Sequence, residues 1–288
     1  MKSAPLLSRL CHASAAMRGL RVRRVAFQPI GPVAVIIILV LVATGVAGAA
    51  PAPDPASQTT PAGRGRERPD FWFGHPAGSL SIRGGWLFAR TGSDLFTFLH
   101  DQLTIEDGDF NAGVIGGDVG VYISPRVDAF VGVDFSRAST VSEYRNFVDN
   151  DRLPIAQDTW LTTVDLSGSI KVALTPRGRE IGRLAWIPRT LVPYAGGGAG
   201  LLWYRLEQLG DFVDFVDLSV FRSGFSSSGW TPSAHLFGGV DVRVWRRLFL
   251  VLEGRYCWAE AELQRDFSGF EPIDLSGFRL TTGINVVF

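Results

Sequence analysis

The last eleven residues of the sequence, FRLTTGINVVF (Phe278 to Phe288), decide the fold. Every second side chain counted back from Phe288 is apolar or a threonine, whereas the positions between them include Arg279, Thr281 and Asn285. A repeat of two residues belongs to a β-strand, because successive side chains of a strand point to opposite faces. The stretch therefore predicts a strand with one apolar and one polar face.

The same alternation recurs along the chain from Phe71 onward. In VDLSGSIKVAL, Leu166, Ile170 and Val172 share a face opposite Asp165. The predicted strands are 79–89, 112–123, 128–137, 164–174, 193–206, 233–245, 248–259 and 278–288. We therefore predict an all-β chain of about eight strands.

The connections between these strands differ in length. Residues 124–126 and 246–247 are tight turns, and the stretch from Thr175 to Pro193 is longer than its place in the order predicts. The remaining connections are long, at 90–111, 138–160, 207–232 and 260–276. Long loops at one end and short turns at the other are typical of a transmembrane antiparallel up-and-down β-barrel with extracellular long loops.

The polar faces indicate which solvent surrounds the sheet. They carry five acidic and four basic side chains: Asp118, Asp134, Asp165, Asp241, Glu253, Lys171, Arg243, Arg255 and Arg279. Because the two signs nearly balance, we expect these side chains to pair inside a narrow lumen while the apolar face meets lipid. The alternative, a soluble barrel of lipocalin type, requires polar residues on the face that we assign to lipid.

The region from Phe71 to Phe288 resembles the OmpA, OmpX and OmpW group of small outer-membrane barrels. The resemblance lies in the alternation that ends at Phe288, in PYAGGGAG (Pro193 to Gly200) and in the order of long and short connections. It implies a place in the bacterial outer membrane, surrounded by outer-membrane lipid. It also implies that the barrel-assembly machinery recognises the terminal strand through Phe278, Leu280, Ile284, Val286 and Phe288.

The N-terminal part of the chain is typical of an exported protein. Arginines precede the apolar run from Pro32 to Gly48, and small residues follow it. We predict a signal peptide at 1–49, with translation starting at Met1 or Met17, a flexible Pro/Ala-rich linker at 50–70 and the barrel at 71–288. An uncleaved membrane anchor is the alternative for the apolar run.

Composition excludes several classes of function. With 28 basic and 28 acidic residues the net charge is zero, so nucleic acid is not an expected partner. Removing the signal peptide removes Cys11 and leaves Cys257 alone, so we expect no internal disulfide. The spacing of potential ligands predicts neither a metal nor another cofactor.

Two of the long connections combine aromatic, aliphatic and acidic residues. They are LFTFLHDQLTI (95–105) and DFVDFVDLSVF (211–221), and we expect them to pack over the barrel mouth or to bind a small apolar ligand there. The sequence thus predicts a non-enzymatic barrel with a structural or surface-binding role. The alternatives are passive uptake of apolar compounds, which the OmpW resemblance implies, and a lipid-modifying enzyme that uses Ser233, His235 and Glu253.

Overall fold

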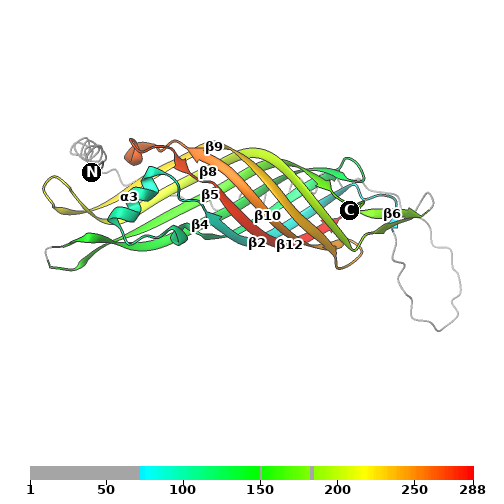
Figure 1. The fold of residues 1–288 in the computed structure, drawn as a ribbon, viewed down its shortest axis with the longest axis horizontal. Helices are drawn as coiled ribbons and strands as arrows, with labels where there is room; N and C mark the ends of the chain where they lie inside the picture. The colour runs from blue at the N-terminus through cyan, green and yellow to red at the C-terminus, as the bar shows by residue number, and fades with distance from the viewer. Residues whose placement is uncertain (1–71, 150, 182–184) are drawn as a thin grey trace, which may run out of the picture. The chain divides into compact units, whose positions relative to one another are not determined.

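The computed structural model describes residues 72–149, 151–181 and 185–288. The predicted signal peptide and linker lie outside the described residues. Eight long antiparallel strands dominate the described part (Figure 1). They are β2 (Gly78–Ala89), β3 (Ala112–Tyr122), β4 (Val127–Val148), β5 (Pro154–Ala173), β8 (Leu191–Val213), β9 (Val220–Arg243), β10 (Leu248–Ala261) and β12 (Gly277–Val287).

These strands close into a barrel. Each pairs with its neighbours in the order β2, β3, β4, β5, β8, β9, β10 and β12. β12 then pairs with β2, from Gly277 opposite Ala89 to Val287 opposite Ser79. The ring has no open edge, and the predicted up-and-down barrel of eight strands is confirmed.

Two of the predicted long loops are wrong. Residues 138–160 and 207–232 mostly continue the strands, so that residues 149–153 join β4 to β5 and residues 214–219 join β8 to β9. The outward face of a strand needs to be apolar only within lipid. Beyond the lipid the apolar alternation fades, while the backbone hydrogen bonds between the strands continue. A prediction from hydrophobic alternation alone therefore ends these strands too early.

The other connections follow the predicted alternation. At one end, called the loop end below, residues 90–111 contain α3 (Asp94–Gln102) and η2 (Asp107–Phe110). Residues 262–276 at the same end contain η3 (Arg265–Phe267) and β11 (Ile273–Asp274). Within the described ranges, no helix is long and apolar enough to cross a membrane.

The opposite end, called the turn end, carries the short connections 123–126 and 244–247. The long connection between β5 and β8, residues 174–190, also lies there and contains β6 (Gly178–Ile181) and β7 (Ala185–Pro188), which pair antiparallel. β7 pairs further with β1 (Trp72–Phe73). This connection therefore lengthens one turn without changing which end each strand reaches.

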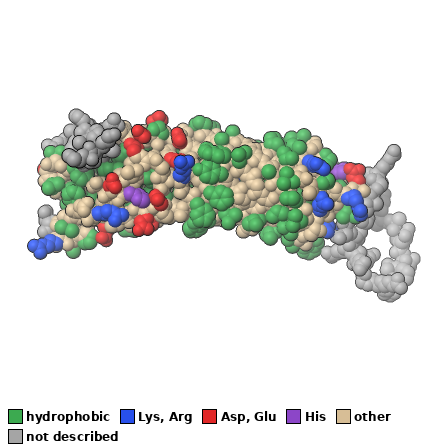
Figure 2. Space-filling view, in the orientation of Figure 1, with side chains coloured by type: hydrophobic (Ala, Val, Ile, Leu, Met, Phe, Trp, Pro, Cys, Tyr) green, Lys and Arg blue, Asp and Glu red, His purple; other side chains and the backbone are tan. Residues whose placement is uncertain are grey.

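The outward face of the barrel is apolar over a continuous belt. Hydrophobic side chains cover the middle of the barrel in Figure 2, and charged side chains gather toward its ends. Large apolar side chains of all eight strands are exposed, among them Ile82, Ile115, Val131, Leu166, Leu201, Leu236, Leu252 and Ile284. Such a surface is far larger than the apolar patches of water-soluble proteins.

We expect a charge on this belt to destabilise the barrel. Leu166 is 41% exposed on β5, and Leu166→Arg should lower the free energy of unfolding by about 2–4 kcal/mol in lipid vesicles. The matched control is Val148→Arg, because Val148 is exposed at the loop end of β4, where the backbone leaves the regular register. Urea titrations of the refolded variants measure both values, and equal values would place Leu166 in water.

Candidate functional site

Buried ion pairs fill the middle of the barrel around Asp134. Three arginines from different strands surround its carboxylate. Arg83 Nη2 lies 2.9 Å from Oδ1, Arg279 Nη1 lies 3.2 Å from Oδ2, and Arg255 Nη1 lies 3.5 Å from the same oxygen. A single β4 carboxylate therefore links β2, β10 and β12 across the lumen.

Each arginine also reaches a second carboxylate. The pairs are Arg83 with Asp118, Arg255 with Glu253 at 2.9 Å, and Arg279 with Asp165 at 3.0 Å. Together with Asp134, these six side chains form what we call the central network, in which each side chain is at most 14% exposed. Charges buried to this extent need partners, because desolvation without compensation costs several kcal/mol per ion.

Two further ion pairs lie on the turn side of the central network. Lys171 Nζ is 2.7 Å from Asp241 and 3.7 Å from the centre of the Tyr194 ring. Arg177, from the connection before β6, lies 2.5 Å from Asp128. Three aromatic side chains, Phe130, Tyr194 and Phe237, form one buried cluster with Val251. Charged and apolar groups thus share the interior.

The structure brings together most of the predicted lumen residues. The ion pairs described above include eight of the nine predicted residues: Asp118, Asp134, Asp165, Lys171, Asp241, Glu253, Arg255 and Arg279. Arg243 is the last residue of β9 and lies half-buried at the turn end. Sequence reasoning missed Arg83, Asp128 and Arg177. Arg83 alternates with Ser81 on the polar face of β2, and this pattern could have identified it.

Two small cavities adjoin the central network. One cavity of about 30 Å³ adjoins Arg83, Asp118 and Glu253, and another of about 20 Å³ adjoins Arg279. Each has room for about one water molecule. The cavities are too small to provide a path for hydrated ions through the central network.

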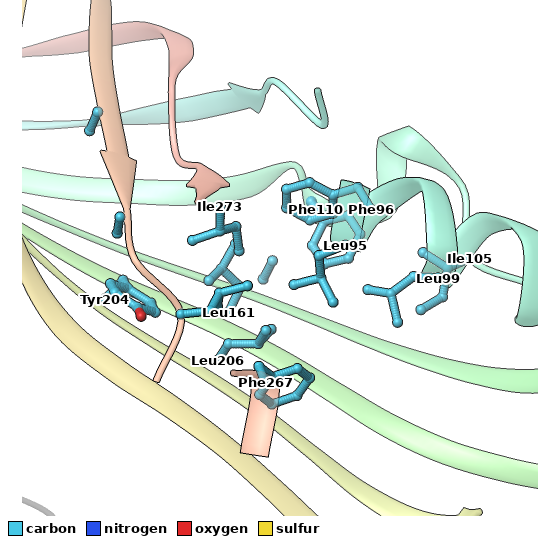
Figure 3. Close-up of a cluster of buried hydrophobic side chains, with 14 of the residues drawn as sticks. Leu95, Phe96, Leu99, Ile105, Phe110, Leu161, Tyr204, Leu206, Phe267 and Ile273 are labelled. Carbon is cyan, nitrogen blue, oxygen red and sulfur yellow. The ribbon is translucent and has the colours of Figure 1, made fainter. Parts of the chain in front are cut away.

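Apolar side chains close the barrel above the central network, at the loop end. α3 turns Leu95, Phe96 and Leu99 inward, and they pack with Leu103, Ile105 and Phe110 against the inner wall (Figure 3). The wall contributes Leu161, Leu202, Tyr204 and Leu206, and the connection 262–276 contributes Phe267 and Ile273. These residues complete what we call the mouth cluster. Spacing of Leu95 and Leu99 by four residues places both on one face of α3.

Hydrogen bonds fix this cap to the rest of the loop end. Arg145 Nε donates to the backbone carbonyls of His100 and Leu103, at 3.0 and 2.6 Å. The backbone N–H of Glu271 donates to both oxygens of Asp94 at 3.1 Å. The segment 95–105 therefore packs into the barrel mouth, which is one of the two arrangements expected from the sequence.

A pocket of about 370 Å³ lies between the mouth cluster and the tips of the strands. We call it the outer pocket. The helical segment contributes Phe98, and the segment 211–221 contributes much of the opposite wall, so the two segments singled out in the sequence meet here. Its lining is Leu95, Phe98, Leu99, Gln102, Leu103, Tyr144, Gln157, Gln208, Phe212, Val213, Asp214, Phe215, Asp217, Ser219, Phe221, Phe225, Asp266, Phe267 and Phe270.

Aromatic contacts hold the walls of the outer pocket. The rings of Phe212 and Phe225 meet edge to face with centroids 4.5 Å apart, and those of Phe98 and Phe270 lie 5.6 Å apart. Paired rings of this kind stabilise each other beyond the area that they bury. The pocket is therefore bounded by side chains that support one another, and its volume suits a small ligand.

The residues weighed for lipid chemistry do not form a catalytic arrangement. Ser233 donates to Asp165 at 3.1 Å, while His235 Nε2 lies 2.7 Å from the hydroxyl of Ser169. Glu253 is occupied by the central network and does not orient the histidine. Over the described ranges, no group of His, Cys, Asp and Glu side chains is suited to hold a metal.

The surface and the interior together identify the environment of the barrel. Its outside is apolar around the ring, the charges buried in its lumen form ion pairs, and its backbone hydrogen bonds close without an edge. A lipid bilayer requires all three features. The chain is a transmembrane β-barrel of the outer-membrane type. The loop end is then the extracellular end, and the turn end is the periplasmic end.

No known family model matches the chain, and no curated protein matches it. Solved structures similar to this barrel include Neisserial surface protein A, at 14% identity over 76% of this chain and 98% of that one, with a TM-score of 0.40. A major outer membrane protein from Thermus thermophilus is 11% identical over 74% of this chain and 100% of that one, with a TM-score of 0.41. OprG from Pseudomonas aeruginosa is 12% identical over 75% and 98%, with a TM-score of 0.38.

We expect the central network to be sensitive to the loss of one partner. Arg279→Met leaves the buried carboxylates of Asp134 and Asp165 with fewer cations and should lower the free energy of unfolding by about 3–5 kcal/mol. Adding Asp165→Asn should recover part of this loss, because it removes a stranded charge. The control is Arg90→Met, which removes an exposed guanidinium group from its pair with the partly buried Asp274 at 3.5 Å and should change stability little. Equal losses in Arg279→Met and Arg90→Met would show that water reaches the network.

Proposed function

We propose that this barrel is a non-enzymatic outer-membrane protein that binds a small, mainly apolar ligand at its extracellular end. The observation that supports this function is the outer pocket, whose 370 Å³ are walled largely by aromatic side chains. Pockets of this size with apolar walls and a few polar groups are typical ligand sites. Strands β4, β5, β8 and β9 contribute seven of the nineteen lining residues, and α3, η3 and the connections at the loop end contribute the rest.

Binding fits the interior better than passage does. A compound that moved from the outer pocket along the barrel axis would meet the mouth cluster and then the central network. The cavities beside that network measure only about 30 and 20 Å³. Passive uptake, the alternative from the sequence, would need a different route, and we therefore propose surface binding.

We also propose that the barrel-assembly machinery recognises the terminal strand. Its five predicted residues, Phe278, Leu280, Ile284, Val286 and Phe288, are all exposed on the outward face. The backbone of Phe288 also completes the pairing with the start of β2, since its carbonyl accepts hydrogen bonds from Ala77 and Gly78. A factor bound to this strand would hold the last edge of the ring before closure.

Equilibrium dialysis tests ligand binding in the outer pocket. The neutral probe 4-phenylbutan-1-ol is measured with barrel in nonionic micelles, and empty micelles correct for partitioning into detergent. We expect saturable uptake by the wild-type barrel. Phe98→Ser combined with Phe215→Ser should weaken it by about tenfold or more, because two aromatic walls are lost.

The matched control is Val141→Ser, which removes an exposed apolar side chain from β4 outside the pocket and should leave binding unchanged. Different migration of heated and unheated samples on a gel confirms that each variant is folded. Uptake by the wild-type barrel that never exceeds that of empty micelles would contradict the proposed function.

A further inference from the structure

The charges that line the outer pocket are all of one sign. Asp214, Asp217 and Asp266 contribute carboxylates, and none of the described lining residues is a lysine, arginine or histidine. An anionic head group would be repelled by such a lining, whereas a cationic one would be attracted. The pocket therefore selects among apolar ligands by the charge that they carry.

Backbone hydrogen bonds fix the positions of these carboxylates. Asp214 Oδ1 accepts from the N–H of Val216 at 2.8 Å, and Asp217 Oδ1 accepts from the N–H of Ser219 at 3.0 Å. Asp266 Oδ2 accepts from the N–H of Ser226 at 2.9 Å. The turn between β8 and β9 holds Asp214 and Asp217, and the β9 backbone holds Asp266, so a ligand would meet these carboxylates without first having to order them.

Gln157 adds a neutral acceptor to the same lining. Its side chain is only 3% exposed, and its Oε1 atom has no hydrogen-bond partner in the structure. A buried carbonyl oxygen without a donor is unfavourable, and such atoms are uncommon in folded proteins. A ligand N–H group that reached this oxygen would satisfy it, whereas a ligand that only accepts hydrogen bonds would not.

The walls of the outer pocket suit a cation for a second reason. Eight of the lining side chains are aromatic: Phe98, Tyr144, Phe212, Phe215, Phe221, Phe225, Phe267 and Phe270. The faces of aromatic rings attract ammonium groups while their carbon surface packs against an apolar body. One set of side chains can therefore hold both parts of an amphipathic molecule.

The segments around the pocket extend the negative potential into solvent. Residues 94–109 contain five acidic side chains and neither lysine nor arginine, and residues 211–217 contain three acidic side chains and again neither basic residue. A field of one sign around a cleft raises the local concentration of oppositely charged ligands. These two segments would attract cations toward the pocket, although the arginines Arg145, Arg222 and Arg265 lie at the same end.

We propose that the ligand of the outer pocket is an amphipathic amine, with an aromatic or aliphatic body and a protonated nitrogen. Its body packs against the phenylalanine walls, and its N–H groups pair with the carboxylates or with Gln157 Oε1. This inference rests on the proposed function, because it names the ligand class of the same pocket. It adds a preference for positive charge that an apolar pocket alone does not have.

Three probes with one carbon skeleton test this preference. They are 4-phenylbutylammonium, 4-phenylbutan-1-ol and 4-phenylbutanoate, each dialysed at neutral pH against barrel in nonionic micelles, with empty micelles as the reference. We expect the amine to bind about tenfold tighter than the alcohol, and the carboxylate to bind most weakly. Failure of both amine and alcohol to bind would contradict the proposed function itself. Equal binding of the two would contradict only the amine preference.

Variants test whether the carboxylates of the pocket lining cause the preference for the amine. One variant combines Asp214→Asn, Asp217→Asn and Asp266→Asn. In this variant the affinity for the amine should fall close to the affinity for the alcohol, while the affinity for the alcohol stays unchanged. The charge-matched control replaces three exposed acids of the same end outside the pocket: Asp101→Asn, Glu143→Gln and Glu262→Gln. It should keep most of the preference. If the control removes the preference as fully as the pocket variant does, the field of the whole end selects cations and the proposed contacts are wrong.

Discussion

The pairing of β12 with β2 is the contact on which the rest of the structure depends. It joins the last strand to the first from residue 277 to residue 287 and leaves the ring without an edge. In hydrocarbon an open edge would expose a row of backbone donors and acceptors with no water to satisfy them. Closure therefore permits the apolar belt to face lipid. It also fixes the width of the lumen, because a barrel of eight strands encloses a space that side chains can fill.

A lumen of that width determines what the barrel can do. Charges that point inward, such as Asp134, are taken out of water and must be paired, and three arginines surround it. The resulting network and the mouth cluster above it occupy the interior. Space for a ligand remains outside them, where β4, β5, β8 and β9 extend beyond the lipid and support the outer pocket. The function that we propose therefore lies at the extracellular end.

The sequence predicted those parts of the structure that depend on the contrast between lipid and lumen. Within the belt, period-two alternation located all eight strands and the facing of residues such as Leu166 and Asp165. Outside the belt this contrast is lost, so the extensions of β4 and β8 looked like loops. Arg83 was missed because the strand 79–89 was identified from its apolar side chains alone, and Arg83 lies on the opposite, polar face. The outer pocket could not be predicted, because it depends on how α3 and the β8–β9 tip meet in space.

The central claim is that the barrel is closed and its lumen filled, and single-channel recording tests it most directly. Purified barrel is reconstituted into planar bilayers, and folding is confirmed by the different migration of heated and unheated samples. The central network and the mouth cluster should block hydrated ions, so the wild-type protein should give no steady ionic conductance. A stable, ohmic current from the wild-type protein would show an open lumen and contradict the account.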